Sequence, residues 1–568
     1  MTRSGGNMPA GRADRGRRSR RSRARRTLLP LLLALAPCAL VLVAGAEAAT
    51  PSEQWRERIA AARELKLWIA TAATALLLAG LCLRLARRER LLASARDATL
   101  VALALATVFA WWHPYRGSLR AWLHVGDSFH YFMGAKYFDE LGYTRLYHCA
   151  VVADAEAGLG PALARSRIRN LETNAIESAQ VALRDPARCQ RHFTPERWRS
   201  FAEDLAFFRE KLTIPLWFQL RSDHGYNAPP TWTLVGGALA AGSADRTRFF
   251  LLTAIDPLLI AAMFGALVWA FGWRVAGIAL IYWGTNQPAS WEWVGGSILR
   301  FDWLAASVAA VCCLKRERPV AAGLLLAWAV GVRIFPIVIV VGIGVAAVWR
   351  MHRERSLAPT RGQRRLAIAF AAGIAAIAAV TSIAVGPRSW VDFARNSRVH
   401  LATDSVNRTG LRPLLAYRHE TRIANSVDAR AADPYLRWRQ ERARAAAERW
   451  PIRVAVSAGY LVLLALALRR QPDWAAGVLG IGMVPVLLEL GSYYFGLLLA
   501  FACLARRQPD VGVALMLLSA VSWWLGTWGG PGRDTLVAHT SLAMLVFVGF
   551  VTLRAALARN AVQPSPGP

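Results

Sequence analysis

Residues 320–349 read VAAGLLLAWAVGVRIFPIVIVVGIGVAAVW, an apolar run that is interrupted at Arg333 and Pro336. A helix of about 20 apolar residues crosses the hydrocarbon core of a bilayer, so this run is too long for one span. Arginine is costly inside hydrocarbon, and proline interrupts the backbone hydrogen bonds of a helix. The stretch therefore predicts two short membrane helices that meet in a turn at one membrane surface.

Apolar runs recur along the whole chain. Of the 568 residues 55% are hydrophobic, yet the formal net charge is +32, so apolar and cationic residues must be segregated along the sequence. We expect an all-α, polytopic bundle of about 13–14 membrane spans. The predicted spans lie near residues 28–48, 66–86, 97–114, 229–243, 247–271, 297–314, 319–332, 334–349, 365–386, 451–469, 474–488, 490–505, 510–528 and 535–553.

The short basic loops between spans predict the orientation of the chain. Arg and Lys accumulate in cytoplasmic loops. We therefore assign to the cytoplasm the clusters at residues 87–90, 315–318, 350–365, 469–470, 506–507 and 554. The chain then divides into a basic N-terminal segment (1–49), N-terminal spans (50–114), a first long outer loop (115–228), a central membrane core (229–386), a second long outer loop (387–450) and C-terminal spans with a short tail (451–568).

The N-terminus has the layout of a targeting segment. Residues 12–26 are almost continuously basic, residues 28–44 are apolar, and the small residues at 46–49 offer a cleavage site. This pattern fits a cleaved signal peptide and an uncleaved signal anchor equally well. Arginines beside a first apolar span are a topology signal, so we do not expect nucleic-acid binding.

Residues 273–296 do not fit the alternation of spans. They begin apolar but contain WGTNQP at 283–288, and a full crossing here would move residues 315–318 outside. We therefore predict a re-entrant or broken helix, whose free backbone groups must be covered by protein or by a wet cavity.

The cysteines leave one question open. Five of the seven lie in apolar spans, whereas Cys149 and Cys189 share the first long loop. They can pair if that loop is oxidised, and the sequence does not decide whether they do. No spacing resembles a zinc site, so we expect no metal and no cofactor.

The densest polar and aromatic stretch follows the third span, where residues 125–138 read VGDSFHYFMGAKYF. Its apolar residues recur at helical spacing, so we predict an amphipathic helix along the membrane interface, with His130 and Lys136 on its polar side. Asp127 would lie at the lipid boundary. A carboxylate just before an apolar helix is also a common N-cap, and this structural interpretation of Asp127 stays open.

This stretch, with GYTRLY at residues 142–147, resembles the membrane glycosyltransferases of the C-type superfamily (GT-C). Among these it most resembles glycosyltransferase family 87, the polyprenol-phosphate-mannose-dependent alpha-mannosyltransferases. Further similar motifs follow in the order of that family: YNAPP at 226–230, GTNQ at 284–287, AGL at 322–324 continuing to Pro336, and SVNRTGL at 405–411. The chain departs from the family at Arg333, where Lys is usual, at residues 489–494, and in the length of the loop at 150–221.

The resemblance implies a hexosyltransferase that moves a sugar such as mannose from a polyprenyl-phosphate donor to a lipid or glycan acceptor outside a bacterial-type plasma membrane. Asp127, just past a membrane exit, is the candidate general base. Arg333 is a fixed positive charge suited to the leaving phosphate, and snorkelling to the headgroups is its structural alternative. The expected partners are the donor, the acceptor and membrane lipids. The other candidate substrate-binding residues are His130, Tyr131, Lys136, Tyr226, Asn227, Asn286, Gln287, Asn407, Glu489 and Tyr493.

Two alternatives stay open. Arg300 can form a structural ion pair with Glu292 or with Asp302, because unpaired charges are expensive at membrane depth. A transporter or flippase of a lipid-linked or polar substrate would also contain broken helices and intramembrane charges. Such proteins usually display two matched halves, and the sequence contains no long internal repeat.

The predicted topology can be tested by labelling from outside. A membrane-impermeant maleimide added to intact cells should modify Asn170→Cys and spare Gln508→Cys. The reason is that residues 115–228 are predicted to be outside and the basic turn at 506–507 inside. The opposite labelling pattern would overturn the assignment of every loop.

Overall fold

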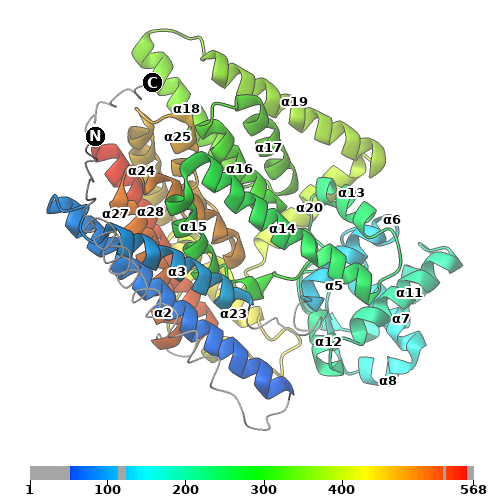
Figure 1. Cartoon of the computed structure of the whole chain (residues 1–568). Coiled ribbons are helices and arrows are strands. Elements are labelled where there is room, and N and C mark those ends of the chain that lie inside the picture. The colour runs from blue at the N-terminus through cyan, green and yellow to red at the C-terminus, as the bar shows by residue number, and fades with distance from the viewer. Residues whose placement is uncertain (1–50, 113–122, 529–531, 559–568) are drawn as a thin grey trace, which may run out of the picture.

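The computed structural model describes residues 51–112, 123–528 and 532–558, and nearly all of its regular structure is helical (Figure 1). Within these residues, seven helices are long and apolar enough to cross a membrane. The protein is therefore an all-α integral membrane protein, as predicted, and the predicted span at 28–48 lies outside the described residues. The seven helices are α2 (Pro51–Leu85), α3 (Ala93–Trp112), α14 (Arg246–Phe271), α19 (Arg361–Ala384), α24 (Trp450–Leu468), α27 (Pro509–Trp528) and α28 (Arg533–Leu557).

Shorter helices fill the space between the long ones. They are α15 (Trp273–Thr285), α16 (Asp302–Lys315), α17 (Pro319–Val332), α18 (Ile337–Glu354), α25 (Asp473–Gly480), α26 (Met483–Leu487) and the 3-10 helix η4 (Ser492–Leu504). α17 packs along α16 and α19, and α18 packs along α25. Gly323 permits the first of these approaches, because a Cβ at that position would lie 2.6 Å from the backbone oxygen of Leu366. Small residues bring membrane helices into such backbone contact.

The helix break predicted at Arg333 is present. α17 ends at Val332, Arg333 has extended backbone angles (φ −151°, ψ 123°), and α18 begins at Ile337. Residues 320–349 therefore form two helices, and the turn between them carries the arginine.

The break predicted within residues 273–296 is also present. α15 ends at Thr285, and the segment that follows, residues 286–301, contains one 3-10 turn, η3 (Trp291–Trp293). Gly296 (φ +79°) and Leu299 (φ +49°) both adopt left-handed backbone conformations, which keep the chain from continuing as a helix. We call residues 286–301 the irregular segment.

Two predicted spans are shorter than expected. The span predicted at 229–243 is α13 (Pro230–Leu239), whose 10 residues reach only about 15 Å, half the hydrocarbon thickness. It ends early because a turn leads directly to Asp245, the N-cap of α14. The span predicted at 297–314 begins only at Asp302, because the irregular segment continues to the residue before it.

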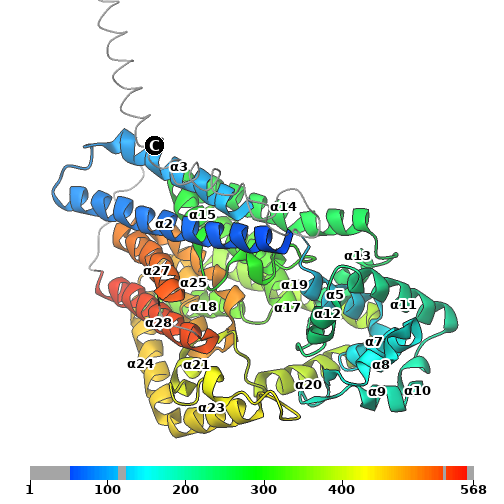
Figure 2. The ribbon, with the colours of Figure 1, turned by 90° about the horizontal axis from the view of Figure 1, so that it is seen from below.

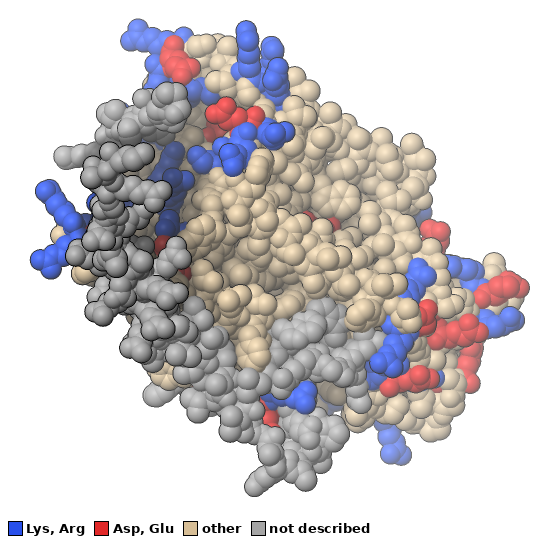
Figure 3. Space-filling model, in the orientation of Figure 1, with Lys and Arg blue, Asp and Glu red and all other residues tan. Residues whose placement is uncertain are grey.

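The basic loops meet at one end of the bundle, which we call the basic end. Figure 3 shows charged side chains gathered toward opposite ends of the visible face, with a wide band of uncharged residues between them. That distribution suits a protein whose middle is covered by lipid. The contacts that join the basic loops to one another are Arg353–Arg469, Gln363–Asp473, Lys315–Trp474, Arg507–Trp474 and Arg554–Asp510.

The described part of the first long loop folds into a domain at the opposite end, which we call the loop end (Figure 2). Aromatic side chains form its core, among them Phe129, Phe132, Phe208 and Trp217, each fully buried. Its elements are α5 (Val125–Lys136), α6 (Phe138–Leu141), α7 (Leu146–Asp154), the π-helical turn η2 (Ala155–Leu159), α8 (Gly160–Leu163), β1 (Arg167–Arg169), β2 (Ile176–Ser178), α9 (Gln180–Arg184), α10 (Ala187–Gln190), α11 (Pro195–Arg209) and α12 (Ile214–Leu220).

Two buried links hold this domain together. A disulfide joins Cys149 on α7 to Cys189 on α10, so the pairing that the sequence left open is formed. Asp154 at the end of α7 accepts hydrogen bonds from Trp217 (2.7 Å), Arg209 (2.6 Å) and Arg221. A buried carboxylate with two guanidinium partners is fully paired, so we assign this group a structural role.

The second long loop lies beside the first at the loop end. Its elements are α20 (Arg388–Ala402), β3 (Arg408–Thr409), α21 (Leu411–Ala416), α22 (Ile423–Ser426) and α23 (Leu436–Glu448). β3 pairs antiparallel with β4 (Leu490–Gly491), which directly precedes η4. The loop is thereby attached to the start of η4. Asn174 of the first loop donates to Thr403 (3.2 Å) of the second.

Candidate functional site

Helix α5 begins two residues before Asp127, so the N-cap interpretation of Asp127 is wrong. His124 is the N-cap, and its Nδ1 accepts the Asp127 backbone N–H at 3.1 Å. The His124 backbone N–H in turn donates to the Gly296 oxygen at 3.0 Å. These two bonds attach the first turn of α5 to the irregular segment and leave the Asp127 carboxylate free for another partner.

Helix α5 is not an amphipathic interface helix with a polar outer side. His130 is only 3% exposed, and Lys136 forms a buried ion pair with Asp204 of α11. The prediction fails because Tyr147 of α7 and Asp204 of α11 cover the side of α5 that the sequence pattern assigned to water. Asp127 is therefore held inside protein.

The partner of Asp127 is Arg300 of the irregular segment. Its Nε lies 2.8 Å from Asp127 Oδ2, and the two side chains are 3% and 14% exposed. Asp256 of α14 holds the Arg300 backbone in place. Its buried carboxylate accepts the backbone N–H groups of Arg300 (2.8 and 3.0 Å) and Phe301 (3.1 Å). The Asp256 carboxylate also lies at the N-terminus of α16, where the helix dipole favours negative charge.

The ion pairs that the sequence suggested for Arg300 are corrected by this geometry. Glu292 pairs with Lys66 of α2 at 3.4 Å, and Asp302 accepts the backbone N–H of Trp303 at 2.8 Å. Asp127 was not considered as a partner, since the two residues lie far apart in the chain. Arg300 is thus a site residue that sequence reasoning missed.

Tyr131, one helical turn after Asp127, is the centre of the site. Its hydroxyl donates to Asn227 Oδ1 (2.9 Å) and accepts from Arg333 Nη2 (3.3 Å). The Arg300 guanidinium lies 4.0 Å from the centre of the same ring, a cation–π distance. Tyr226 contacts the Tyr131 ring edge-on at 5.7 Å. Five predicted site residues, Asp127, Tyr131, Tyr226, Asn227 and Arg333, are therefore brought together.

The first residues of η4 complete the arrangement. The Tyr493 ring lies 5.8 Å from the Arg300 guanidinium, and the Tyr494 ring lies 6.0 Å from that of Arg333. Tyr494 was not predicted, although it is adjacent to Tyr493 in the stretch that departs from the family pattern. We call the group Asp127, Tyr131, Arg300, Arg333, Tyr493 and Tyr494 the two-arginine cluster.

The two arginines are not fully paired within this cluster. Arg300 is 4% exposed and Arg333 is 7% exposed. Within the described part of the chain, Arg300 Nη1 and Arg333 Nε have no hydrogen-bond partner. Unsatisfied buried donors are costly, and planar guanidinium groups bind phosphate and carboxylate oxygens well. The cluster is therefore suited to bind an anion next to the Asp127 carboxylate.

His130 and Lys136 have partners of their own in the loop domain. His130 Nε2 hydrogen-bonds the Tyr147 hydroxyl at 2.7 Å, and its Nδ1 lies 3.9 Å from Asp223. Burial lowers the pKa of His130, so the neutral imidazole predominates at pH 7. Lys136 also donates to the Gly242 oxygen at 2.7 Å, which leaves it a structural cation.

Asn407 and Glu489 belong to a neighbouring ion network. Glu489 pairs with Arg412 (2.6 Å) and Arg408 (3.4 Å). The Asn407 side chain accepts from Ser405, and its backbone oxygen accepts the N–H of Ser492 at 2.8 Å. These contacts attach the second loop to the segment that carries Tyr493, so both residues act as supports of the cluster.

Asn286 and Gln287 lie at a different junction. Thr285, just before them, accepts hydrogen bonds from Ser519 (2.8 Å) and Trp523 of α27 at its backbone oxygen. Gln287 lies beside Gly526 of the same helix. The contacts of Thr285 and Gln287 therefore join α15 to α27, and Nδ2 of the buried Asn286 has no hydrogen-bond partner among the described residues.

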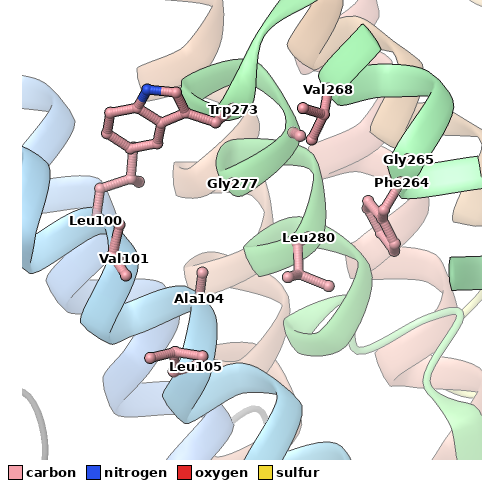
Figure 4. A pocket seen from close by; sticks show the side chains of 11 residues that line it. Leu100, Val101, Ala104, Leu105, Phe264, Gly265, Val268, Trp273, Gly277 and Leu280 are labelled. Atoms are coloured by element: carbon pink, nitrogen blue, oxygen red, sulfur yellow. The ribbon is translucent and has the colours of Figure 1, made fainter.

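Two further features bear on ligands. No group of three or more His, Cys, Asp or Glu side chains that could hold a metal ion occurs in the described residues. An apolar groove of about 300 Å³ lies between α3, α14 and α15, with Leu100, Phe264, Trp273 and Gly277 in its wall (Figure 4). Its walls are apolar, so it can accommodate a lipid chain and not a sugar.

The fold and the cluster together define an α-helical integral membrane protein with a buried, arginine-rich site at its loop end. Comparison with protein-family models, with curated proteins and with solved structures finds no match for this chain.

The role of Asp256 gives a test of this geometry. In Asp256→Asn the remaining oxygen can still accept both N–H groups, but the new NH2 group faces the Arg300 N–H, which lies 2.8 Å from Oδ2 in the wild type. Two buried donors then oppose each other, at a cost of about 1–3 kcal/mol. We expect a lower thermal unfolding midpoint for the purified protein in detergent. Asp245→Asn is the matched control on the same helix, because Asn caps as well as Asp. Equal midpoints for the two variants would contradict the assigned role.

Proposed function

We propose that the chain is a GT-C-type hexosyltransferase with about 13–14 membrane crossings. It transfers a sugar such as mannose from a polyprenyl-phosphate donor to a lipid or glycan acceptor. The observation that supports this most is the two-arginine cluster, in which Arg300 Nη1 and Arg333 Nε lack partners beside a buried carboxylate. A phosphate held by the two arginines would supply the missing acceptors.

Asp127 is the proposed general base of an inverting transfer. The acceptor hydroxyl oxygen attacks the anomeric carbon on the face opposite the phosphate, and its proton passes to a carboxylate oxygen of Asp127. The bond between the anomeric carbon and the phosphate oxygen breaks. The products are the glycosylated acceptor and polyprenyl phosphate, whose charge is stabilised by Arg333 and Arg300.

Aromatic and amide groups around Tyr131 are suited to the sugar. The rings of Tyr131, Tyr226 and Tyr493 supply flat apolar surfaces, on which a sugar ring can stack. Asn227, which binds the Tyr131 hydroxyl, offers an amide NH2 to sugar hydroxyl oxygens. Donor recognition would thus combine two fixed charges with an aromatic wall.

Two observations support an extracytoplasmic site in a bacterial-type plasma membrane. The loop domain contains the Cys149–Cys189 disulfide, and disulfides persist in oxidising compartments. The basic loops meet at the other end of the bundle, which fits the preference of Arg and Lys for the cytoplasmic side.

The catalytic proposal rests on Asp127, and Asp127→Asn tests it. Loss of a positioned base typically costs roughly 10²–10⁴-fold in rate. We therefore expect transfer from radiolabelled polyprenyl-phosphate mannose to membrane acceptors to fall by that factor. Asp139→Asn, the same change at an exposed position on α6, should leave transfer unchanged.

A double variant separates catalysis from charge pairing. Asp127→Asn leaves the buried Arg300 without its carboxylate, which can destabilise the protein. Arg300→Gln added to Asp127→Asn removes that unpaired charge, so the unfolding midpoint should recover while transfer stays low. Recovery of transfer together with stability would mean that Asp127 only pairs Arg300 and that another group is the base. Absence of transfer by the wild-type protein would instead favour the transporter or flippase alternative.

Arg333 is tested by a graded pair of substitutions. Arg333→Gln removes charge-assisted hydrogen bonds to the phosphate, which are worth about 1.5–3 kcal/mol, and should raise the donor KM or lower turnover accordingly. Arg333→Lys keeps the charge but not the planar fork, and should retain part of the activity. Arg318→Gln, at the other end of α17, is the control. Wild-type kinetics in both Arg333 variants would identify Arg333 as a snorkelling anchor.

A further inference from the structure

One face of α20 carries exposed arginines and exposed aliphatic side chains together. Residues three or four apart share a face of a helix. Val391 and Leu401 are each 59% exposed, and the side chains of Arg388 and Arg395 are 86% and 73% exposed. Arg398 is exposed on the same face. We call Arg388, Val391, Arg395, Arg398 and Leu401 the α20 outer face.

The other side of α20 is packed against the first loop, which fixes the orientation of the helix. Phe393 contacts Tyr143 with ring centres 6.2 Å apart, and His400 contacts His224 at 5.0 Å. Burial lowers the pKa of His400 to about 4 and lowers that of His224 well below its ordinary value. Both rings are therefore neutral at pH 7, and their contact carries no charge repulsion.

The chain path places α20 next to the lipid-facing surface. α19 is a candidate membrane span that ends at Ala384, and α20 begins four residues later, after a turn at Gly386 (φ +91°). Ile383 in the last turn of α19 is 86% exposed, and Val380 is 53% exposed. Such side chains on a membrane helix are covered by lipid. α20 thus starts where the chain leaves the hydrocarbon.

The α20 outer face carries a net positive charge. Its three arginines are opposed by Asp392, which lies 3.8 Å from both Arg388 and Arg395. Three positive charges against one negative charge leave a net charge of +2. Basic amphipathic helices at a membrane surface insert their aliphatic side chains at the headgroup boundary and pair their cations with anionic lipids. We propose that the α20 outer face binds the headgroups of anionic phospholipids at the loop end of the protein.

Binding of lipid headgroups to the α20 outer face would restrict the motion of the second long loop. Arg408, which follows α20, donates to the backbone oxygens of Leu401 (3.0 Å) and His400 and pairs with Glu489. A lipid-anchored α20 is thereby linked to the ion network beside the two-arginine cluster. The proposal does not depend on the transferase activity.

Lipid-selective quenching tests the proposal on the full chain. The five cysteines outside the disulfide are replaced by alanine, and a fluorophore is attached at Leu401→Cys. The protein is reconstituted into equal parts of phosphatidylcholine and phosphatidylglycerol, with one lipid brominated at a time. For two net positive charges we expect phosphatidylglycerol to be preferred at the label by about 30-fold, because each charge near the surface contributes about fivefold.

Two matched comparisons decide the outcome. Arg388→Gln, Arg395→Gln and Arg398→Gln together should abolish the preference. Arg430→Gln, Arg437→Gln and Arg444→Gln remove three other exposed arginines of the same loop and should not change it. A label at the exposed Glu420→Cys should not be quenched by either lipid. Absence of quenching at Leu401→Cys, equal quenching by both lipids, or an equal loss of preference in the two triple variants would each overturn the proposal.

Discussion

The arrangement at the loop end depends on one buried carboxylate in a membrane helix. Asp256 of α14 accepts the backbone N–H groups of Arg300 and Phe301 at 2.8–3.1 Å, where the irregular segment ends and α16 begins. Backbone donors at membrane depth must be satisfied within the protein, and an irregular segment leaves more of them free than a helix does. The carboxylate permits the chain to stay non-helical there, and the non-helical backbone is what directs Arg300 toward Asp127.

The second constraint is the cost of burying two guanidinium groups close together. Arg300 and Arg333 enter from two different helix breaks, and the one carboxylate of the cluster, Asp127, pairs directly with Arg300 alone. The tyrosine rings of residues 131, 493 and 494 offset part of the cost, because their faces attract cations. Two unfavourable contributions remain: the repulsion between the two arginines, and the buried N–H groups that have no hydrogen-bond partner among the described residues. An anionic ligand would offset the repulsion and accept hydrogen bonds from the free N–H groups. We therefore interpret the cluster as a binding site and not only as a structural core.

The sequence predicts the parts of this architecture that depend on local hydropathy and fails where tertiary contacts decide. The long apolar runs identify α14, α19 and α28, and the Arg333 and Pro336 pair identifies the break between α17 and α18. Hydropathy does not reveal the turn that ends α13, because small and apolar residues continue through it. The polar side of α5 was assigned to water, since its neutralising partner Asp204 lies 68 residues away. Arg300 could be recognised as a buried charge but not matched to Asp127 without the fold.

The site is positioned by two different parts of the protein. Arg300 and Arg333 are fixed by the membrane core, through Asp256 and through the ends of α17 and α18. Asp127 belongs to α5, whose start is bonded to the irregular segment at Gly296 and whose end is held in the loop domain by Lys136 and Asp204. A shift of the loop domain would therefore move the carboxylate relative to the two arginines. In the proposed reaction, the membrane core thus sets the position of the donor phosphate, while the loop domain sets the base that meets the acceptor.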